Sequence, residues 1–169
     1  MRRIIYFVAS SLDGFIARQG GEIDWLFTDQ DYGYTDFLAG IDTVVMGRKT
    51  YDLCLTFGEY PYKNQKSFVF SRKKADLVHA VAVDEPVAEF VARLRIEPGK
   101  DIWLVGGGEL AGAFFAAGAV DEIQVFVHPI LIGTGLPLAA GLLKDVKLVF
   151  QQTKAFDTGL VKLTYSVRI

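Results

Sequence analysis

Short apolar runs with little polar alternation recur along the chain, and glycine or polar residues follow most of them. Runs of this kind are typical of strands that are covered on both faces of a sheet. The first run, Ile4–Ala9, is rich in β-branched and aromatic residues and ends at the loop Ser10–Gly14. Further strands are predicted at residues 41–46, 66–70, 79–83, 102–105 and 122–128.

Helical patterns lie between these strands. They predict helices at residues 29–38, 48–53, 86–95 and 109–117. Pro86 suits the first turn of the third helix, because its fixed φ and missing N–H are tolerated there. Strands that alternate with helices predict a mostly parallel sheet with helices packed against it.

The end of the chain departs from this alternation. Residues 146–156 and 160–169 are predicted to be consecutive strands joined by Asp157-Thr158-Gly159, where glycine suits a positive φ. This hairpin adds an antiparallel edge to the sheet. The predicted fold class is therefore α/β with a mixed sheet, and residues 1–169 form one domain without an internal repeat or linker.

Composition narrows the classes of function. Of the 169 residues, 51% are hydrophobic and 22% are charged, which is typical of a packed globular protein. The formal net charge of -2 gives no broad basic field, so we expect no nucleic-acid partner. No nucleophile elbow, phosphate loop of the kinase type or paired zinc cysteines occur, which disfavours hydrolases, kinases and deaminases.

Cysteine and histidine usage points to the cytoplasm and away from metals. Cys54 is the only cysteine, we expect no secretory leader, and no apolar run reaches the roughly 20 residues of a membrane span. His79 and His128 are the only histidines and lie far apart in the sequence. We therefore expect a cytoplasmic protein with no membrane partner and no metal site.

Candidate chemistry gathers directly after the predicted strands. In open α/β sheets, ligands bind beyond the carboxyl ends of the strands. Here those positions hold Ser10–Gly14, Gly47–Thr50, Ser71-Arg72 and Gly106–Leu110.

The triple glycine Gly106–Gly108 opens a predicted helix. It lets a pyrophosphate approach the backbone, and the free N–H groups of the helix favour an anion. The alternative is a tight strand-to-helix turn without a ligand. Gly106, Gly108 and Ala111 have the spacing of a dinucleotide-binding fingerprint, but the chain has His128-Pro129 where a Rossmann domain has its acidic residue, which disfavours standard NAD binding.

Three cations follow other strand ends. Arg48 and Lys49 open the helix after Gly47, and Arg72 follows the third strand. Together they suit the extra phosphate of NADPH better than the ribose hydroxyls of NADH. The alternative for each is a solvated surface cation.

Asp13 and Asp24 are the candidate proton donors, because a partly desolvated carboxyl group can deliver a proton or hold a substrate N–H. The alternatives are a turn residue for Asp13, which precedes Gly14, and a helix cap for Asp24.

The order of the motifs resembles the dihydrofolate reductase superfamily, and within it the stand-alone relatives of the C-terminal reductase domain of riboflavin biosynthesis. The resemblance covers essentially the whole chain. The segments that carry it are VASSLDGFIA at 8–17, VMGRKTY at 45–51, SR at 71–72, VGGGEL at 105–110 and HPILIGTGLPL at 128–138.

This resemblance implies a three-layer αβα fold with a mixed sheet of about eight strands and NADPH laid across the strand ends. Phosphate and adenosine contacts would fall on Gly47, Arg48, Lys49, Thr50, Ser71 and Arg72. The pyrophosphate turn would fall on Gly106, Gly107, Gly108, Glu109 and Leu110 after Val105, with the nicotinamide near Ala9 and Ile16.

The expected activity is hydride transfer from NADPH to a C=N or C=O bond of a small heterocyclic (pyrimidine- or pterin-like) or sugar-like substrate, as in 5-amino-6-(5-phosphoribosylamino)uracil reductase. Relatives of this type are commonly dimers, so a homodimer is expected. The alternatives are a non-catalytic dinucleotide-binding protein with the same fold and a protein that binds the phosphates of another nucleotide.

Overall fold

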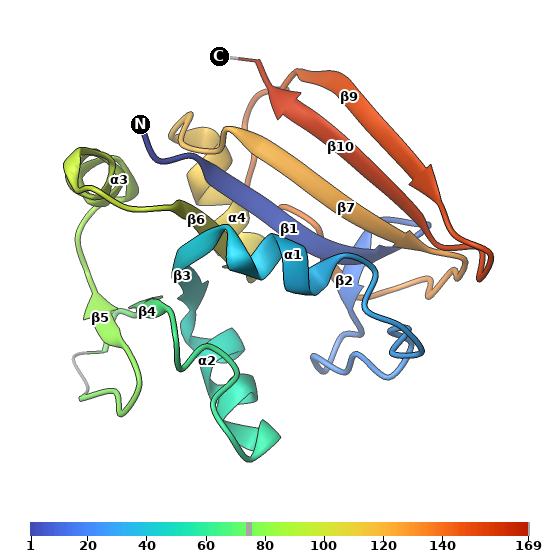
Figure 1. Cartoon of the computed structure of the whole chain (residues 1–169), viewed down its shortest axis with the longest axis horizontal. Helices are drawn as coiled ribbons and strands as arrows, with labels where there is room; N and C mark the ends of the chain where they lie inside the picture. Colours follow the sequence, from blue (N-terminus) through green and yellow to red (C-terminus); the bar gives the residue numbers. More distant parts are fainter. Residues whose placement is uncertain (74–75, 169) are drawn as a thin grey trace.

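The computed structural model describes residues 1–73 and 76–168, and its centre is a mixed sheet in the strand order β5-β4-β3-β6-β1-β7-β10-β9 (Figure 1). A second, two-stranded sheet pairs β2 with β8. The strands are β1 (Ile4–Ser11), β2 (Phe15–Ala17), β3 (Ile41–Gly47), β4 (Lys66–Phe70), β5 (Val81–Val83), β6 (Asp101–Gly106), β7 (Glu122–His128), β8 (Leu136–Pro137), β9 (Leu148–Ala155) and β10 (Val161–Val167).

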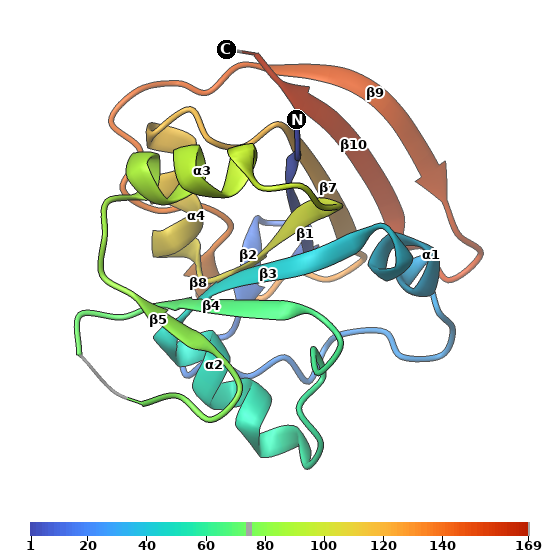
Figure 2. The ribbon, with the colours of Figure 1, turned by 60° about the vertical axis from the view of Figure 1, so that its left-hand side comes forward.

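Helices cover both faces of the large sheet. They are α1 (Tyr34–Ala39), α2 (Arg48–Cys54) with a 3-10 turn over Leu55–Phe57, α3 (Val87–Ile96) and α4 (Gly108–Ala116). Figure 2 shows α3 and α4 together on one side of the sheet and α2 on the other. The predicted three-layer α/β fold with a mixed sheet of eight strands and a terminal hairpin is confirmed.

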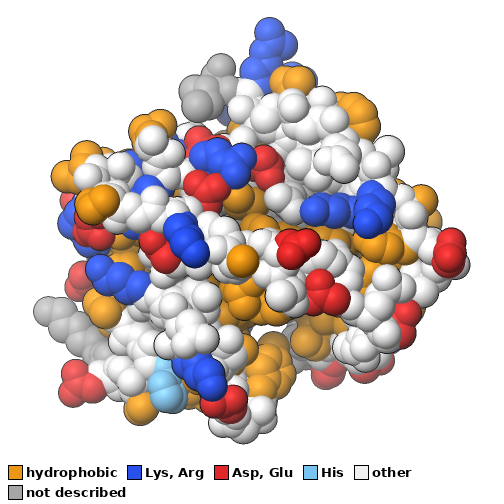
Figure 3. All heavy atoms as spheres, in the orientation of Figure 1, with side chains coloured by type: hydrophobic (Ala, Val, Ile, Leu, Met, Phe, Trp, Pro, Cys, Tyr) orange, Lys and Arg blue, Asp and Glu red, His pale blue; other side chains and the backbone are white. Residues whose placement is uncertain are grey.

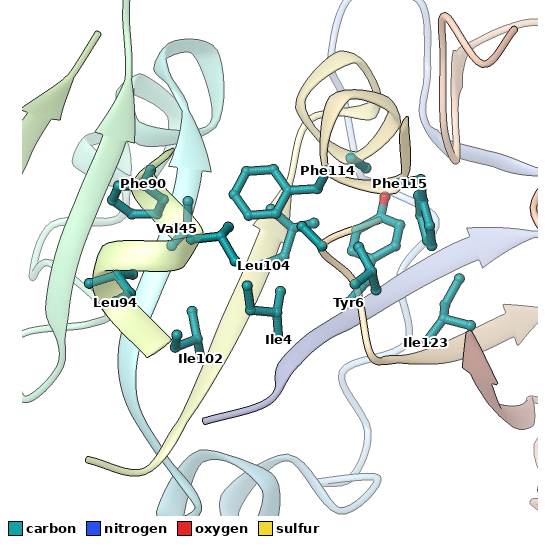
Figure 4. Packing of buried hydrophobic residues seen from close by; sticks show 14 of the residues in the cluster. Ile4, Tyr6, Val45, Phe90, Leu94, Ile102, Leu104, Phe114, Phe115 and Ile123 are labelled. Atoms are coloured by element: carbon teal, nitrogen blue, oxygen red, sulfur yellow. The ribbon is translucent and has the colours of Figure 1, made fainter. Parts of the chain in front are cut away.

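The apolar runs of the sequence become the central strands because both of their faces are buried. Ile4, Tyr6 and Leu104 point toward α3 and α4, where they pack against Phe114 and Phe90 (Figure 4). All five of these side chains are fully buried. Strands β1, β3, β4, β5, β6 and β7 run parallel, so their carboxyl ends lie at one edge of the sheet.

A second buried cluster lies on the face of α1 and α2. Tyr51 and Cys54 of α2 pack with Trp103 of β6, whose indole N–H donates to the carbonyl of Phe7 at 3.0 Å. Cys54 is buried, and burial raises the pKa of its thiol. Phe37 of α1 stacks on Phe7, which fixes this short helix over β1.

The terminal hairpin is much less covered than the central strands. Strand β10 pairs with β7 in antiparallel orientation, and β9 pairs with β10 at the edge of the sheet. Every residue of β9 is exposed, including the apolar residues Leu148, Val149 and Phe150. The predicted extension of the last strand to Ile169 lies outside the described residues.

Two of the predicted boundaries are wrong for local reasons. Helix α1 begins at Tyr34 and not at Asp29, because Tyr32 and Gly33 adopt positive φ values of 53° and 84°, which no right-handed helix contains. Strand β1 continues through Ser10 and Ser11 because they pair with Val127 and His128 of β7.

Candidate functional site

The connections that leave β3 and β6 diverge at the carboxyl edge of the sheet. These strands are neighbours, yet β3 continues into α2 on one face and then to β4, whereas β6 continues into α4 on the other face and then to β7. In open α/β sheets, such a divergence opens the crevice in which ligands bind. The predicted cofactor residues Gly47–Thr50 and Gly106–Leu110 flank this point.

Gly106 and Gly107 form the turn from β6 into α4, and their φ values are 140° and 80°. Only glycine adopts such angles without strain. A Cβ built on Gly106 meets nothing within 4 Å, and one built on Gly107 meets only the Thr50 hydroxyl at 3.9 Å. The backbone of this turn is therefore open on the side where β3 ends, which fits the close approach of a diphosphate.

Gly108 differs from the two glycines before it. A Cβ on Gly108 would lie 2.2 Å from the carbonyl oxygen of Pro137, so this glycine is needed for packing against the end of β8. Its own carbonyl accepts the N–H of Ala140 at 2.9 Å. Glu109 is exposed in the first turn of α4, and Leu110 packs against the core.

The predicted cations lie on the neighbouring strand ends. Arg48 pairs with Asp52 at 2.9 Å on the exposed side of α2, and exposed pairs of this type contribute little stability, so the guanidinium remains available to an anion. Lys49 and Arg72 are exposed. Ser71 accepts the N–H of Lys73 at 3.2 Å, so it shapes the turn that carries Arg72.

The residues predicted to contact the nicotinamide lie on the other side of β6. Ala9 is a half-buried residue near the carboxyl end of β1, which pairs with β6. Ile16 lies in β2 and packs partly against the core, and Val105 packs on the face of α1 and α2. The structure thus arranges the predicted cofactor residues along the consecutive strands β4, β3, β6 and β1.

Asp13 joins two loops at this edge. Its carboxylate accepts the Ser11 hydroxyl at 2.6 Å and the N–H groups of Ile132 and Gly133 at 3.3 and 2.8 Å. The hydrogen bond from Ser11, followed by those from the two backbone N–H groups, holds the pKa of Asp13 below its ordinary value. An exposed carboxyl group with a lowered pKa is an anion at neutral pH, so the geometry supports its alternative role as a turn residue.

Asp24 lies apart from the other predicted site residues. It forms a two-point ion pair with Arg18, with N–O distances of 2.7 and 3.1 Å, and 62% of its side chain is exposed. Arg18 lowers the pKa of Asp24. Its proposed role as proton donor stays a prediction, and the structure gives it no support.

His128 lies at the end of β7, and no feature of the sequence indicated that its side chain is a structural anchor. Its side chain is buried, its Nδ1 is 2.9 Å from the carbonyl oxygen of Phe126, and its Nε2 accepts the N–H of Phe27 at 3.2 Å. This pattern requires the neutral ring with the proton on Nδ1, and burial lowers the pKa of His128 accordingly. His128 thereby anchors the segment that contains Trp25 and Phe27, whose rings contact it edge-on.

Comparison with known proteins identifies relatives across the whole chain. The chain is 38% identical to the uncharacterized protein YyaP of Bacillus subtilis (strain 168) over 97% of its own length and 94% of that protein. The crystal structure of a putative riboflavin biosynthesis protein from Shewanella sp. PV-4 superposes with a TM-score of 0.88 at 27% identity, with full coverage of both chains.

A bifunctional enzyme shares the fold over part of its length. It is the diaminohydroxyphosphoribosylaminopyrimidine deaminase/5-amino-6-(5-phosphoribosylamino)uracil reductase of Thermotoga maritima, with a TM-score of 0.77 at 17% identity. The match covers 99% of this chain and 57% of that one. None of the helices within residues 1–73 and 76–168 is both long and apolar enough to cross a membrane. The family model of the RibD C-terminal domain matches residues 2–162, and the chain therefore belongs to the RibD C-terminal domain family, whose members include reductases.

Proposed function

We propose that this protein is an NADPH-dependent reductase that transfers hydride to a C=N or C=O bond of a small heterocyclic, pyrimidine- or pterin-like, or sugar-like substrate. Membership of the RibD C-terminal domain family supports a reductase. The observation that carries the cofactor assignment is the open turn Gly106-Gly107 at the divergence of β3 and β6, with cationic residues on the adjoining strand ends.

Each group of residues has a distinct part in this proposal. The backbone of Gly106 and Gly107 and the first N–H groups of α4 hold the diphosphate, because the turn carries no side chain and the helix end favours an anion. Arg48, Lys49 and Thr50 flank the diphosphate from α2. Ser71 and Arg72 lie one strand further out, where the additional phosphate of NADPH would distinguish it from NADH.

NADPH, when bound, supplies the hydride for the reduction. Ala9 and Ile16 line the nicotinamide end of the proposed site, and their apolar side chains limit the access of water. Asp13 remains an anion at neutral pH, so it is suited to orient a water molecule or a substrate N–H and not to donate its own proton.

The first test is a titration of the protein with NADPH and with NADH, for the native chain and for Arg72→Ala. Loss of one charged contact to a phosphate is expected to weaken NADPH binding about tenfold and to leave NADH binding unchanged. Lys63→Ala is the matched control, because Lys63 is an exposed cation that pairs with Glu59 and lies outside the proposed site.

The outcomes separate the candidate functions. No preference for NADPH over NADH in the native chain would contradict the cofactor assignment. Preferential NADPH binding without oxidation by any pterin, pyrimidine or carbonyl compound would favour the alternative of a non-catalytic dinucleotide-binding protein.

We also infer that the chain forms a homodimer through β9. This edge strand is exposed along its whole length, and Leu148, Val149 and Phe150 add apolar surface to its unpaired backbone groups. Long exposed edge strands with apolar side chains readily pair with another chain. Light scattering is expected to give the mass of a dimer for the native chain and of a monomer for Phe150→Lys.

A further inference from the structure

A small pocket lies between the segment before α1 and the exposed face of the β9–β10 hairpin. Its volume is about 200 Å³, which is below the range of sites that enclose a whole drug-sized ligand. Figure 3 shows basic side chains beside hydrophobic surface over this hairpin. The pocket is lined by Tyr32, Gly33, Gln152, Thr153, Lys154, Phe156, Lys162 and Thr164, which include two lysines and no carboxylate.

The two lysines face each other across the β9–β10 hairpin. Lys154 and Lys162 are direct partners in the antiparallel pair β9–β10, and like charges in this position repel each other. Lys162 is half-buried, and burial together with the charge of Lys154 lowers its pKa. Within the described residues, neither ammonium group has a carboxylate within 4.0 Å.

The nearby carboxylates have other partners. Glu122 attracts Lys162 from β7, but its own oxygens are bound by Arg3 at 3.1 Å and by Gln124 at 2.6 Å. Asp29, beside the pocket, accepts the Tyr32 hydroxyl at 2.7 Å. Both carboxylates keep their charge, but in the described part of the chain neither forms an ion pair with Lys154 or Lys162, and the lining itself is cationic.

The rest of the lining is suited to an anion. The side chains of Gln152 and Thr164, which share a face of the hairpin with the lysines, make no hydrogen bond to another residue in the part of the chain that the structure describes. The Lys162 ammonium lies 5.2 Å from the ring centre of Phe126, and the Lys154 ammonium lies 4.9 Å from that of Phe156. Aromatic surface behind the lysines lowers the local dielectric constant, which strengthens their attraction for a bound anion.

The pocket is aligned with the proposed site of reduction. Ala9 pairs with Phe126, Phe126 pairs with Lys162, and Lys162 pairs with Lys154, so these residues form one row across β1, β7, β10 and β9. Neighbouring strands lie about 4.8 Å apart, which places the backbone of Lys162 about 10 Å from that of Ala9. A substrate about 10 Å long would span that distance.

We propose that Lys154 and Lys162 bind an anionic group of the substrate, a phosphate or a carboxylate, while the reducible part of the substrate extends toward Ala9. The placement of the reducible group toward Ala9 rests on the proposed reductase function. The anion subsite itself depends only on the pocket, so it can be tested without the cofactor.

The test follows backbone amide signals by NMR while inorganic phosphate, or acetate in a parallel series, is added to the free protein at constant ionic strength. Saturable shifts are expected at Thr153, Lys154 and Lys162. Lys162→Gln is expected to weaken the phosphate or acetate binding at least about tenfold, because a charged hydrogen-bond donor is lost. Lys147→Gln is the matched control, since Lys147 lies just before the same hairpin but pairs with Asp145.

NADPH binding is measured on the same samples, which separates the two proposals. Saturation by phosphate identifies a phosphorylated substrate, and saturation by acetate alone identifies a carboxylate. If NADPH binds but both anions give linear shifts, or shifts that Lys162→Gln leaves unchanged, the anion subsite is overturned and the cofactor proposal stands. If an anion saturates the pocket but NADPH does not bind, the subsite stands and the reductase proposal falls.

Discussion

Gly106 and Gly107 come directly before α4, whereas Gly108 and Gly112 lie within it. The two pairs differ in what surrounds the missing side chain. A Cβ on either of the first two would meet open space or, at 3.9 Å, the Thr50 hydroxyl. A Cβ on Gly108 or Gly112 would overlap the carbonyl oxygens of Pro137 and Ala140, at 2.2 and 1.7 Å. The second pair is therefore explained by internal packing, whereas the first pair is required by its positive φ values and leaves its backbone uncovered.

The largest change in stability is expected from a substitution at Gly112. An alanine in a helix normally adds about 1 kcal/mol of stability relative to glycine. At this position the new Cβ meets backbone that cannot rotate away, so we expect Gly112→Ala to lower the free energy of unfolding by about 2 kcal/mol or more. Chemical denaturation measures this change, with Ala113→Gly on the exposed side of α4 as the control. If Gly112→Ala were more stable than the native chain, Gly112 would not be required by packing.

A smaller loss of stability, with a loss of binding, is expected at Gly107. Its φ of 80° should cost an alanine about 1–2 kcal/mol in the free energy of unfolding. Gly118, just after α4, has a φ of 62° and is equally open, so Gly118→Ala is the control for the cost of a positive φ. We expect only Gly107→Ala to weaken NADPH binding, by about tenfold in a titration. Equal NADPH affinities in the two variants would contradict a role of the Gly106-Gly107 turn in binding the diphosphate.

The smallest effect is expected from Asp13, which holds the segment that leads to Pro137. Asp13→Asn keeps the shape of the side chain but weakens its hydrogen bonds to Gly133 and Ile132, so the Tm at pH 7 should fall slightly. Because the pKa of Asp13 is lower in the folded chain, the native residue stabilises fully above its ordinary value near 3.8. That advantage should disappear as the pH falls through the lower folded value. A difference in Tm that is constant with pH would contradict the ionic role of Asp13.

The hydrophobic pattern was sufficient to predict the layers of the fold, because runs such as Ile4–Ala9 owe their strand conformation to burial on both faces. The residue type of Tyr32 gives no sign of its left-handed backbone, and the one signal for the later start of α1 was Gly33, whose φ is also positive. Spacing identified the glycine turn after β6. It did not separate Gly107 from Gly108, because that difference depends on the approach of a loop almost 30 residues later in the chain.

The lysine pair illustrates a signal that was present in the sequence. A hairpin centred on Asp157-Thr158-Gly159 places Lys154 opposite Lys162, so their pairing follows from the position of the turn. Which face of the hairpin they share with Phe126 depends on how β10 pairs with β7. That register is a tertiary property, and the hairpin pattern alone does not determine it.

The burial of Cys54 gives the protein an internal reporter of motion. It is the only thiol and the last residue of α2, the helix that begins with Arg48, and it is buried against the sheet. A thiol with a raised pKa and no access to solvent reacts with alkylating agents only when its cover opens. The rate of that labelling therefore measures how often α2 lifts from the sheet, and a ligand held by Arg48 would slow it.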